Sequence, residues 1–332
     1  SGMARWFLDR LSQDHEVEAT LGGAMGLAAV LDAGMEERID ASRRELVSEA
    51  VARLGRTSDI VLLLNWSKDR GSGEAFGRLV WEHVPPALRC PMVQADRDFF
   101  IVWEGKLNEE LASLFRERDL DGIRAPLSCE QREGVRAISG VRPGENIWID
   151  GHVIGRATRE EVLICQGPAG ELQVEGIELK PTGVQRLGRF DLPSAIIRSG
   201  QVRRTRATPR CLRSKGVVAC LIDHCAEEAV YRCRDAAYVV TVGDDTSKIA
   251  AALLYRLGVP VIAITDGDED GISSDDILYP GSYVFRLLPG NDDLVGAMIA
   301  AEHFQGGHRV ELRSGIEDMA GRVRAACGDR LL

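Results

Sequence analysis

The amino-acid sequence predicts an α/β protein. Short, continuous apolar runs recur toward the C-terminus, as is typical of strands that a parallel sheet buries on both faces. These runs are Val217–Ile222, Tyr238–Val242 and Pro260–Ile264. Two amphipathic segments of helical length separate them, namely Cys225–Asp235 and Ser247–Leu257. The alternation of strand and helix therefore predicts parallel strands joined by right-handed crossovers.

The length of 332 residues is enough for two or three domains. We expect an N-terminal Rossmann-like α/β domain (residues 1–125), a small β-rich middle domain (126–200) and a parallel-sheet α/β domain (201–332). In the first domain, strands are predicted at His15–Leu21, Asp59–Leu64, Cys90–Ala95 and Phe99–Trp103. Helices are predicted there at Ala4–Leu11, Glu36–Leu54, Ala75–Trp81 and Leu107–Arg118. In the last domain, further elements are predicted at Tyr283–Leu287, Leu294–Glu302 and Gly315–Cys327.

A polar loop rich in glycine and serine follows the strand Asp59–Leu64 and leads into the next helix. A strand, such a loop and a helix N-terminus together favour an anion, and Lys68 is placed to neutralise it. The glycine spacing and the lysine position do not fit a Walker A motif. The alternative is that Ser72 simply caps the helix.

The middle domain is predicted to consist of β-hairpins. Asp150-Gly151 is a dipeptide favoured in tight hairpin turns, and it joins two of the predicted strands. The four strands are Asn146–Asp150, His152–Ala157, Val162–Gln166 and Leu172–Ile177. Only Trp148 offers an aromatic ring for base stacking, which argues against a single-strand nucleic-acid platform. We expect a spacer or a dimerisation element here, and hence a possible homo-oligomer.

Acidic side chains follow all three apolar runs of the C-terminal domain. They are Asp223 after the first, Asp244 and Asp245 after the second, and Asp266, Asp268 and Asp270 after the third. Parallel strands end at one edge of a sheet, where open α/β sheets bind ligands. Carboxylates gathered there favour a hard cation such as Mg²⁺, held by one or two of them together with water or phosphate. The alternative is a set of solvated turns in an acidic protein.

This stretch resembles the Toprim domain, the Mg²⁺-binding module of primases, topoisomerases, small nucleases and ribosomal RNA maturases. The matching residues are Asp223, Gly243, Asp266-Gly267-Asp268 and Gly271, in the family's order and at comparable spacing. The resemblance covers about a sixth of the chain. It implies a Toprim-like C-terminal domain in which Asp223, Asp266 and Asp268 bind Mg²⁺ and serve catalysis, with Asp244, Asp245 and Asp270 in support.

One residue departs from the Toprim pattern. The family's first acidic residue is a glutamate, to which general acid/base work is assigned, and the chain has the shorter Asp223 there. Glu227 and Glu228 follow about one helical turn later. With Asp223 in this place, metal binding is still expected, and whether the protein is an enzyme stays open.

A basic run immediately precedes the strand that ends at Asp223. It includes Arg203, Arg204 and Arg206, and nothing acidic interrupts it. Arginines beside a carboxylate–metal centre would hold phosphate oxygens while the cation offsets charge. The alternative is a surface linker whose charge pairs with the acidic domains.

Composition excludes several classes of protein. The net charge of −10 argues against a general polyanion binder. No apolar run approaches the ~20 residues that span a membrane, so no membrane partner is expected. The eight cysteines form no paired CxxC motifs, which favours reduced thiols in a cytoplasmic protein over a zinc site.

A second resemblance covers most of the chain. Four segments, at residues 22–37, 62–80, 196–205 and 241–271, resemble an uncharacterised protein family of methanogenic archaea. This resemblance implies an archaeal origin and a cytoplasmic setting, and no activity.

Two functions follow as hypotheses. The first is a Mg²⁺-dependent protein that acts on a phosphoester or a nucleotide, by phosphotransfer or hydrolysis. The second is a non-catalytic regulatory or assembly protein that binds a nucleotide or another phosphorylated metabolite. A nucleic acid as the phosphate-containing partner is a weaker possibility, because the chain is acidic and poor in aromatic residues.

Overall fold

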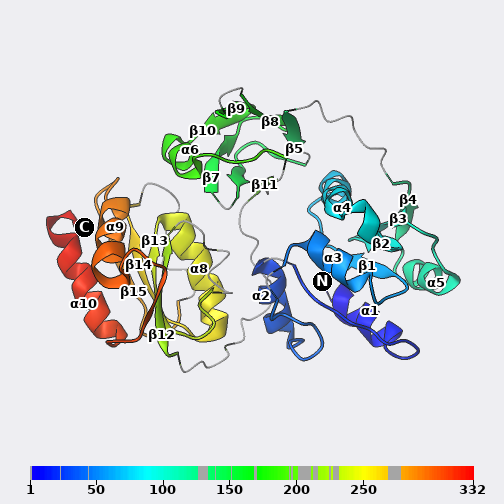
Figure 1. The fold of residues 1–332 in the computed structure, drawn as a ribbon, viewed down its shortest axis with the longest axis horizontal. Helices are drawn as coiled ribbons and strands as arrows, with labels where there is room; N and C mark the ends of the chain where they lie inside the picture. Colours follow the sequence, from blue (N-terminus) through cyan, green and yellow to red (C-terminus); the bar gives the residue numbers. More distant parts are fainter. Residues whose placement is uncertain are drawn as a thin grey trace. The chain divides into compact units, whose positions relative to one another are not determined.

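The computed structural model describes residues 2–332 except 23, 44, 126–133, 139, 151, 168–169, 194, 196, 201–210, 212–215, 224–225, 227–231 and 268–277. Helices and sheets alternate along these residues, which confirms the α/β class (Figure 1). The chain forms two compact units, one of Ser1–Gly22 with Glu37–Gln201 and the other of Gly23–Glu36 with Val202–Leu332. The division into three domains stays a prediction.

The N-terminal part of the first unit contains a mixed sheet of order β1-β2-β3-β4. Its strands are β1 (Val61–Leu64), β2 (Met92–Ala95), β3 (Phe99–Glu104) and β4 (Asp121–Ile123). β1 runs parallel to β2, β2 antiparallel to β3, and β3 parallel to β4. The helices are α1 (Met3–Leu11), α3 (Val47–Leu54), α4 (Arg70–His83), η1 (Pro86–Leu88) and α5 (Glu109–Glu117). The sequence-based predictions of β1, β2 and β3 are thus confirmed within two residues at each end.

Side chains that alternate along β2 reach two cores. Val93 and Ala95 pack with residues of α1 and α5, whereas Met92 packs with residues of α3 and α4. This alternation is the expected consequence of the two-residue period of a strand. The sheet therefore carries helices on both of its faces.

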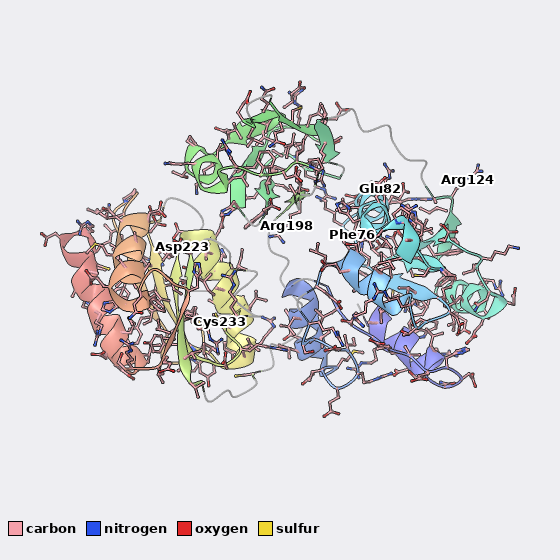
Figure 2. All side chains as sticks on the ribbon, viewed as in Figure 1. Phe76, Glu82, Arg124, Arg198, Asp223 and Cys233 are labelled. Carbon is pink, nitrogen blue, oxygen red and sulfur yellow. The ribbon has the colours of Figure 1, made fainter. Side chains whose placement is uncertain are left out.

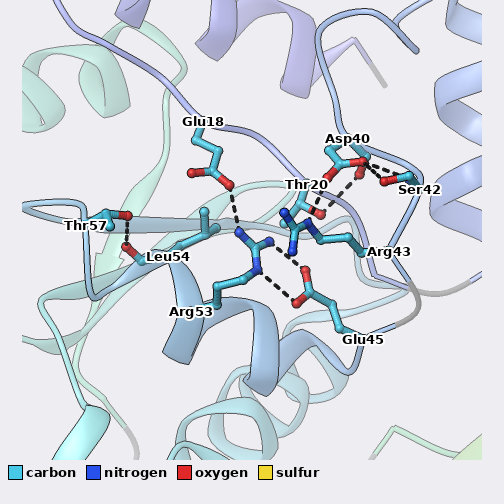
Figure 3. A network of polar contacts seen from close by, with 9 residues as sticks. All are labelled: Glu18, Thr20, Asp40, Ser42, Arg43, Glu45, Arg53, Leu54 and Thr57. Carbon is cyan, nitrogen blue, oxygen red and sulfur yellow. Dashed lines mark hydrogen bonds and ion pairs between the residues drawn. The ribbon is translucent and has the colours of Figure 1, made fainter.

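Two predictions near the N-terminus are wrong. No strand covers the described residues 15–21, where Thr20 forms only an isolated bridge to Asp40, and the predicted helix Glu36–Leu54 is reduced to α3. The Asp40 carboxylate accepts hydrogen bonds from Ser42 N (2.8 Å) and Ser42 Oγ (2.6 Å) (Figure 3). Such local side-chain bonds compete with helix formation.

Ion pairs around Arg53 hold the same region together. The Arg53 guanidinium donates to Glu45 at 2.7 and 3.1 Å and to Glu18 at 2.7 Å (Figure 3). Asp40 N also donates to Ala19 O at 2.8 Å. The segments on either side of residues 23–36 are therefore joined within the first unit.

The β-rich part of the first unit contains two sheets around one core. Their strands are β5 (Val135–Ile138), β6 (Asn146–Ile149), β7 (His152–Ala157), β8 (Val162–Gln166), β9 (Leu172–Glu175), β10 (Ile177–Leu179) and β11 (Ile197–Ser199). The orders are β10-β7-β6-β11 and β5-β8-β9, and α6 (Pro181–Leu187) packs against β7. Both predicted hairpins, β6–β7 and β8–β9, are confirmed.

The second unit contains a five-stranded sheet of order β15-β14-β13-β12-β16. Its strands are β12 (Val218–Asp223), β13 (Ala236–Val242), β14 (Val261–Thr265), β15 (Tyr283–Arg286) and β16 (Arg309–Glu311). The first four are mutually parallel, and β16 is antiparallel to β12. The parallel sheet predicted from the three apolar runs is confirmed.

Helices cover both faces of this sheet (Figure 1). They are α2 (Ala24–Ala33), α8 (Asp244–Leu257), α9 (Asp292–Phe304), α10 (Ile316–Cys327) and η3 (Gly328–Arg330). Residues of α9 and α10 share one apolar core with the sheet, and α8 packs on the other side against β13 and β14. Helix α2, which the sequence did not predict, packs against α8.

A bidentate ion pair fixes α2 to α8. Arg256 Nε and Nη2 donate to the two carboxylate oxygens of Asp32 at 2.9 and 2.7 Å. The two side chains are only 8% and 2% exposed. The second unit is thus built from two distant stretches of sequence.

Among the residues that the structure describes, no helix has both the length and the apolar character needed to cross a membrane.

Candidate functional site

The strand register places three of the predicted acidic residues at one edge of the C-terminal sheet. Asp223 ends β12 beside Val242 of β13, and Val242 lies beside Ile264 of β14. Asp244 and Asp266 each follow that row by two residues. Neighbouring strands lie about 4.8 Å apart, so the ends of these three strands lie within a span of roughly 10 Å.

Asp266 is the least exposed of the three aspartates. Its residue is 3% exposed, and its Oδ2 accepts the backbone N–H of Gly290 at 2.5 Å. Gly290 lies directly before α9, and Gly267 beyond Asp266 has a positive φ of 71° that favours glycine. The side chain is therefore held in place where the loop after β14 meets the start of α9.

Asp244 and Asp245 occupy the first turn of α8. Gly243 has a φ of 96°, which turns the chain sharply from β13 into the helix. Asp244 is buried, and a hydrogen bond of 2.8 Å joins Thr241 Oγ1 to Ser247 Oγ below it. Negative charge is favourable at a helix N-terminus, so the dipole of α8 stabilises both carboxylates there.

Asp223 is exposed, unlike Asp244 and Asp266. Figure 2 shows its side chain toward the end of the sheet opposite to Cys233.

The remaining predicted site residues lie outside the described residues: Asp268, Asp270, Arg203, Arg204 and Arg206. Across the described part of the chain, no group of three or more His, Cys, Asp or Glu side chains is arranged to hold a metal ion. Mg²⁺ often uses one or two carboxylates with water or phosphate for the rest of its shell. The donor chemistry of Asp223 and Asp266 fits such a cation, although they do not form a complete protein cage.

Lys68, the predicted anion ligand of the first unit, already has partners within the chain. Its Nζ donates to Glu145 Oε2 at 2.7 Å and to Ser199 Oγ at 3.1 Å. Burial raises the pKa of Glu145, but the hydrogen bonds from Lys68 and from the Arg142 N–H outweigh it and lower that pKa below its usual value. The charge of Lys68 is thus compensated, and a phosphate-binding role for it stays a prediction.

The helix that follows Lys68 is capped by its own chain. α4 begins at Arg70, five residues before the predicted start, with Asp69 as the N-cap. The Asp69 carboxylate accepts Ser72 N–H at 2.8 Å, and Ser72 Oγ accepts Asp69 N–H at 3.3 Å. Ser72 therefore completes a capping box rather than acting as the N-cap itself.

One buried carboxylate, that of Asp96, was not singled out from the sequence. Asp96 is 0% exposed and follows β2 directly, in the manner of the acidic residues that end the C-terminal strands. It accepts hydrogen bonds from Asn65 Nδ2, Ser67 N, Ser67 Oγ and Arg97 N at 2.7 to 2.9 Å. These donors give Asp96 a structural role, because they fix the loop between β1 and α4.

The fold and this sheet edge define a class: an α/β protein with aspartates at or just after the carboxyl ends of the parallel strands of its C-terminal sheet. The model of a family described as "Uncharacterized protein conserved in archaea (DUF2117)" matches residues 1–307, and the chain belongs to that family. A protein of Methanocaldococcus jannaschii, described as "Uncharacterized protein MJ0065", is 32% identical over 318 residues. That alignment covers 90% of this chain and 86% of the relative. No solved structure matches the chain.

The family assignment confirms the archaeal resemblance expected from the sequence. The family match and this relative do not show that the N-terminal sheet is Rossmann-like or that the C-terminal sheet is Toprim-like.

Proposed function

We propose that the chain binds Mg²⁺ and a phosphate-containing small molecule at the carboxyl edge of its C-terminal, Toprim-like sheet, and acts there on a phosphoester or a nucleotide. The observation that supports this proposal is the position of Asp223, Asp244 and Asp266 in the chain, each at or just after the carboxyl end of one of three neighbouring strands. Ligands of open α/β sheets bind at that edge.

Electrostatics favours a cation at this position. Negative charges at one edge of a sheet repel one another, and Asp244 and Asp266 are both buried there. A bound divalent ion offsets this repulsion. Aspartate oxygens are the ligands that hard cations prefer, and the chain places no thiol at the sheet edge among its described residues.

The proposed roles divide between holding and recognising. Asp223, Asp266 and Asp268 would hold Mg²⁺, with Asp244, Asp245 and Asp270 in support. Arg203, Arg204 and Arg206 would hold the phosphate oxygens through bidentate hydrogen bonds. When bound, the cation supplies charge neutralisation at the phosphate and lowers the pKa of a water ligand.

Calorimetric titration of Mg²⁺ and Mn²⁺ into the wild type, Asp223→Asn and Asp266→Asn tests the proposal. We expect a measurable heat for the wild type and its loss in both variants. Asp223 is exposed, so Asp223→Asn should leave the fold intact. Glu302→Gln is the matched control, because it removes one negative charge from an exposed position of α9. Equal heats for all four proteins, or none for the wild type, would refute a metal site at this edge.

The second candidate function is non-catalytic binding of a nucleotide or another phosphorylated metabolite, in a regulatory or assembly protein. The observation in its favour is that Asp223 stands where the Toprim pattern has a glutamate, to which general acid/base work is assigned. A thermal shift with ADP or ATP that persists in EDTA, without turnover of any phosphoester, would support this candidate over the first.

A further inference from the structure

Two buried thiols lie side by side in the C-terminal unit, outside the candidate site. Cys220 is in the middle of β12 and is 1% exposed; Cys233 lies just before β13 and is 0% exposed. Both are free cysteines, and each lies close enough to shift the pKa of the other. Nothing in the sequence indicated this pairing, because Cys220 falls within a predicted strand and Cys233 within the predicted helix Cys225–Asp235.

The backbone independently brings the two residues together. Cys220 Sγ lies 3.7 Å from the carbonyl oxygen of Arg232, the residue that precedes Cys233. With standard peptide dimensions, the Cys220 sulfur is then at most about 7 Å from the Cys233 Cα. The two residues are thus close neighbours, and closing a disulfide would draw the Cys233 side chain toward β12.

Arg309 holds this arrangement from the neighbouring strand. It is the cross-strand partner of Cys220 on β16. Its guanidinium donates to the carbonyl oxygen of Arg232 at 2.9 Å and to both carboxylate oxygens of Asp235. The turn that carries Cys233 is therefore tied to the strand beside Cys220.

The surroundings also distinguish the two sulfur atoms. Hydrogen bonding with Cys233 lowers the pKa of the Cys220 thiol against the opposing effect of burial, and the nearby Arg309 lowers it further. Hydrogen bonding with Cys220, together with burial, raises the pKa of Cys233. Cys220 is thus the better nucleophile, and Cys233 is the thiol that would resolve its oxidation.

We propose that Cys220 and Cys233 form a reversible disulfide when the protein meets a peroxide, so that this pair is a redox-modification site. Hydrogen peroxide is close to water in size, which suits thiols that exclude bulky disulfides. The Cys220 thiolate attacks one peroxide oxygen, the O–O bond breaks, and the departing hydroxide takes up a proton to become water. The Cys233 sulfur then attacks the Cys220 sulfenic acid. The S–S bond forms, the S–O bond breaks, and a second water leaves with the Cys233 proton. Two thiols lose two electrons, and one peroxide is reduced to two waters.

The test is peptide mapping of the full chain under non-reducing conditions, after treatment with hydrogen peroxide and alkylation of free thiols. We expect one linked peptide pair that joins Cys220 to Cys233 and that disappears after dithiothreitol. Cys327 provides the matched control. It is also 0% exposed, burial raises the pKa of its thiol, and it should remain alkylatable after unfolding.

Cys220→Ser and Cys233→Ser should each abolish the linked peptide, and Cys327→Ser should not. The wild-type map alone can overturn the proposal if either variant fails to fold. Recovery of Cys220 and Cys233 as reduced thiols while the exposed Cys211 is oxidised would do so. A disulfide from either residue to Cys225 would do so as well. None of these outcomes depends on a cation at the sheet edge.

Discussion

At the scale of single residues, carboxylates of this chain are stabilised in different ways according to their surroundings. Asp96 is saturated by neutral hydrogen-bond donors, and Asp32 is held by a guanidinium. Asp266 receives a backbone N–H next to the start of a helix. The residue type alone therefore does not tell a structural aspartate from a candidate metal ligand. The difference lies in the groups that surround each carboxylate.

Asp40 provides a prediction about pH. Hydrogen bonds from the Ser42 hydroxyl and backbone N–H, and then the charge of Arg43, lower the pKa of Asp40 from 3.8 to about 2. An acid whose pKa is lowered by folding stabilises the folded state above its unfolded pKa and loses that effect as pH falls toward the folded value. The melting temperature of wild type should exceed that of Asp40→Asn near neutral pH, and the difference should shrink between pH 4 and pH 2.

Thermal denaturation of the two proteins followed by circular dichroism checks this expectation. Glu49→Gln is a useful comparison, because it alters another acidic residue of the same region. A difference between wild type and Asp40→Asn that stayed constant down to pH 2 would contradict the assignment.

At the scale of elements, sequence periodicity predicted most strands. It did not predict the elements that depend on contacts between distant parts of the sequence. The apolar runs of β12, β13 and β14 were evident because both faces of a parallel sheet are buried. Helix α2 was not predicted, and it is stabilised by packing on α8. Periodicity could not show that packing, since α8 lies far away in the sequence.

The candidate site was foreseeable in part for the same reason. Asp223, Asp244 and Asp266 each lie at or just after the carboxyl end of a strand of one sheet, because parallel strands share their direction, which the sequence implied. The Gly290 N–H that contacts Asp266 comes from the loop after β15 and had no signature of its own. The partners of Lys68 were equally hidden, as Glu145 and Ser199 follow it by 77 and 131 residues.

Helix α4 provides a prediction about close packing. A methyl group at Gly77 would lie 1.7 Å from Gln94 Oε1 and 2.8 Å from the Trp103 ring, whose Nε1 donates to that oxygen at 3.0 Å. Alanine favours a helix over glycine by about 1 kcal/mol, but overpacking costs about 1 to 3 kcal/mol. We expect Gly77→Ala to lower the free energy of unfolding.

Gly71→Ala in the same helix is the control. The nearest atom to its added methyl group would be 3.8 Å away, which is an ordinary contact. Urea denaturation should therefore give Gly71→Ala a stability equal to or above wild type. A Gly77→Ala variant as stable as Gly71→Ala would show that β2 and α4 are less tightly packed than the structure indicates.

At the scale of the whole molecule, sequence order and compact units do not coincide. Residues 23–36 belong to the second unit, although the chain on both sides of them belongs to the first. Leu27, Ala28 and Leu31 of α2 are buried, and the Asp32–Arg256 pair is almost excluded from water. A change near the N-terminus can thus act on the C-terminal sheet.

Asp32→Ala tests this organisation. Removal of one partner of a buried ion pair leaves the other charge unpaired and costs about 3 to 5 kcal/mol. We expect faster hydrogen exchange of the α8 amides, with exchange in α5 unchanged. Phe7→Ala should have the opposite pattern, because the Phe7 ring packs against Phe115 of α5, with ring centroids 5.9 Å apart.

Asp318→Ala controls for the loss of a charge. Its exposed pair with Arg322 joins residues one turn apart on α10, and solvent screens such pairs so that they contribute little to stability. Unchanged exchange of α8 in Asp32→Ala would mean that α2 contributes little to the second unit.

The Asp32–Arg256 pair also constrains how the chain can be made. Arg256 follows Asp32 by 224 residues. At typical synthesis rates of about 5 to 20 residues per second, the ribosome needs roughly 10 to 45 s to deliver the partner of a helix that it has already released. During that interval the apolar side of α2 has nothing of its own unit to pack on, so chaperones that hold nascent chains would be expected to engage it there.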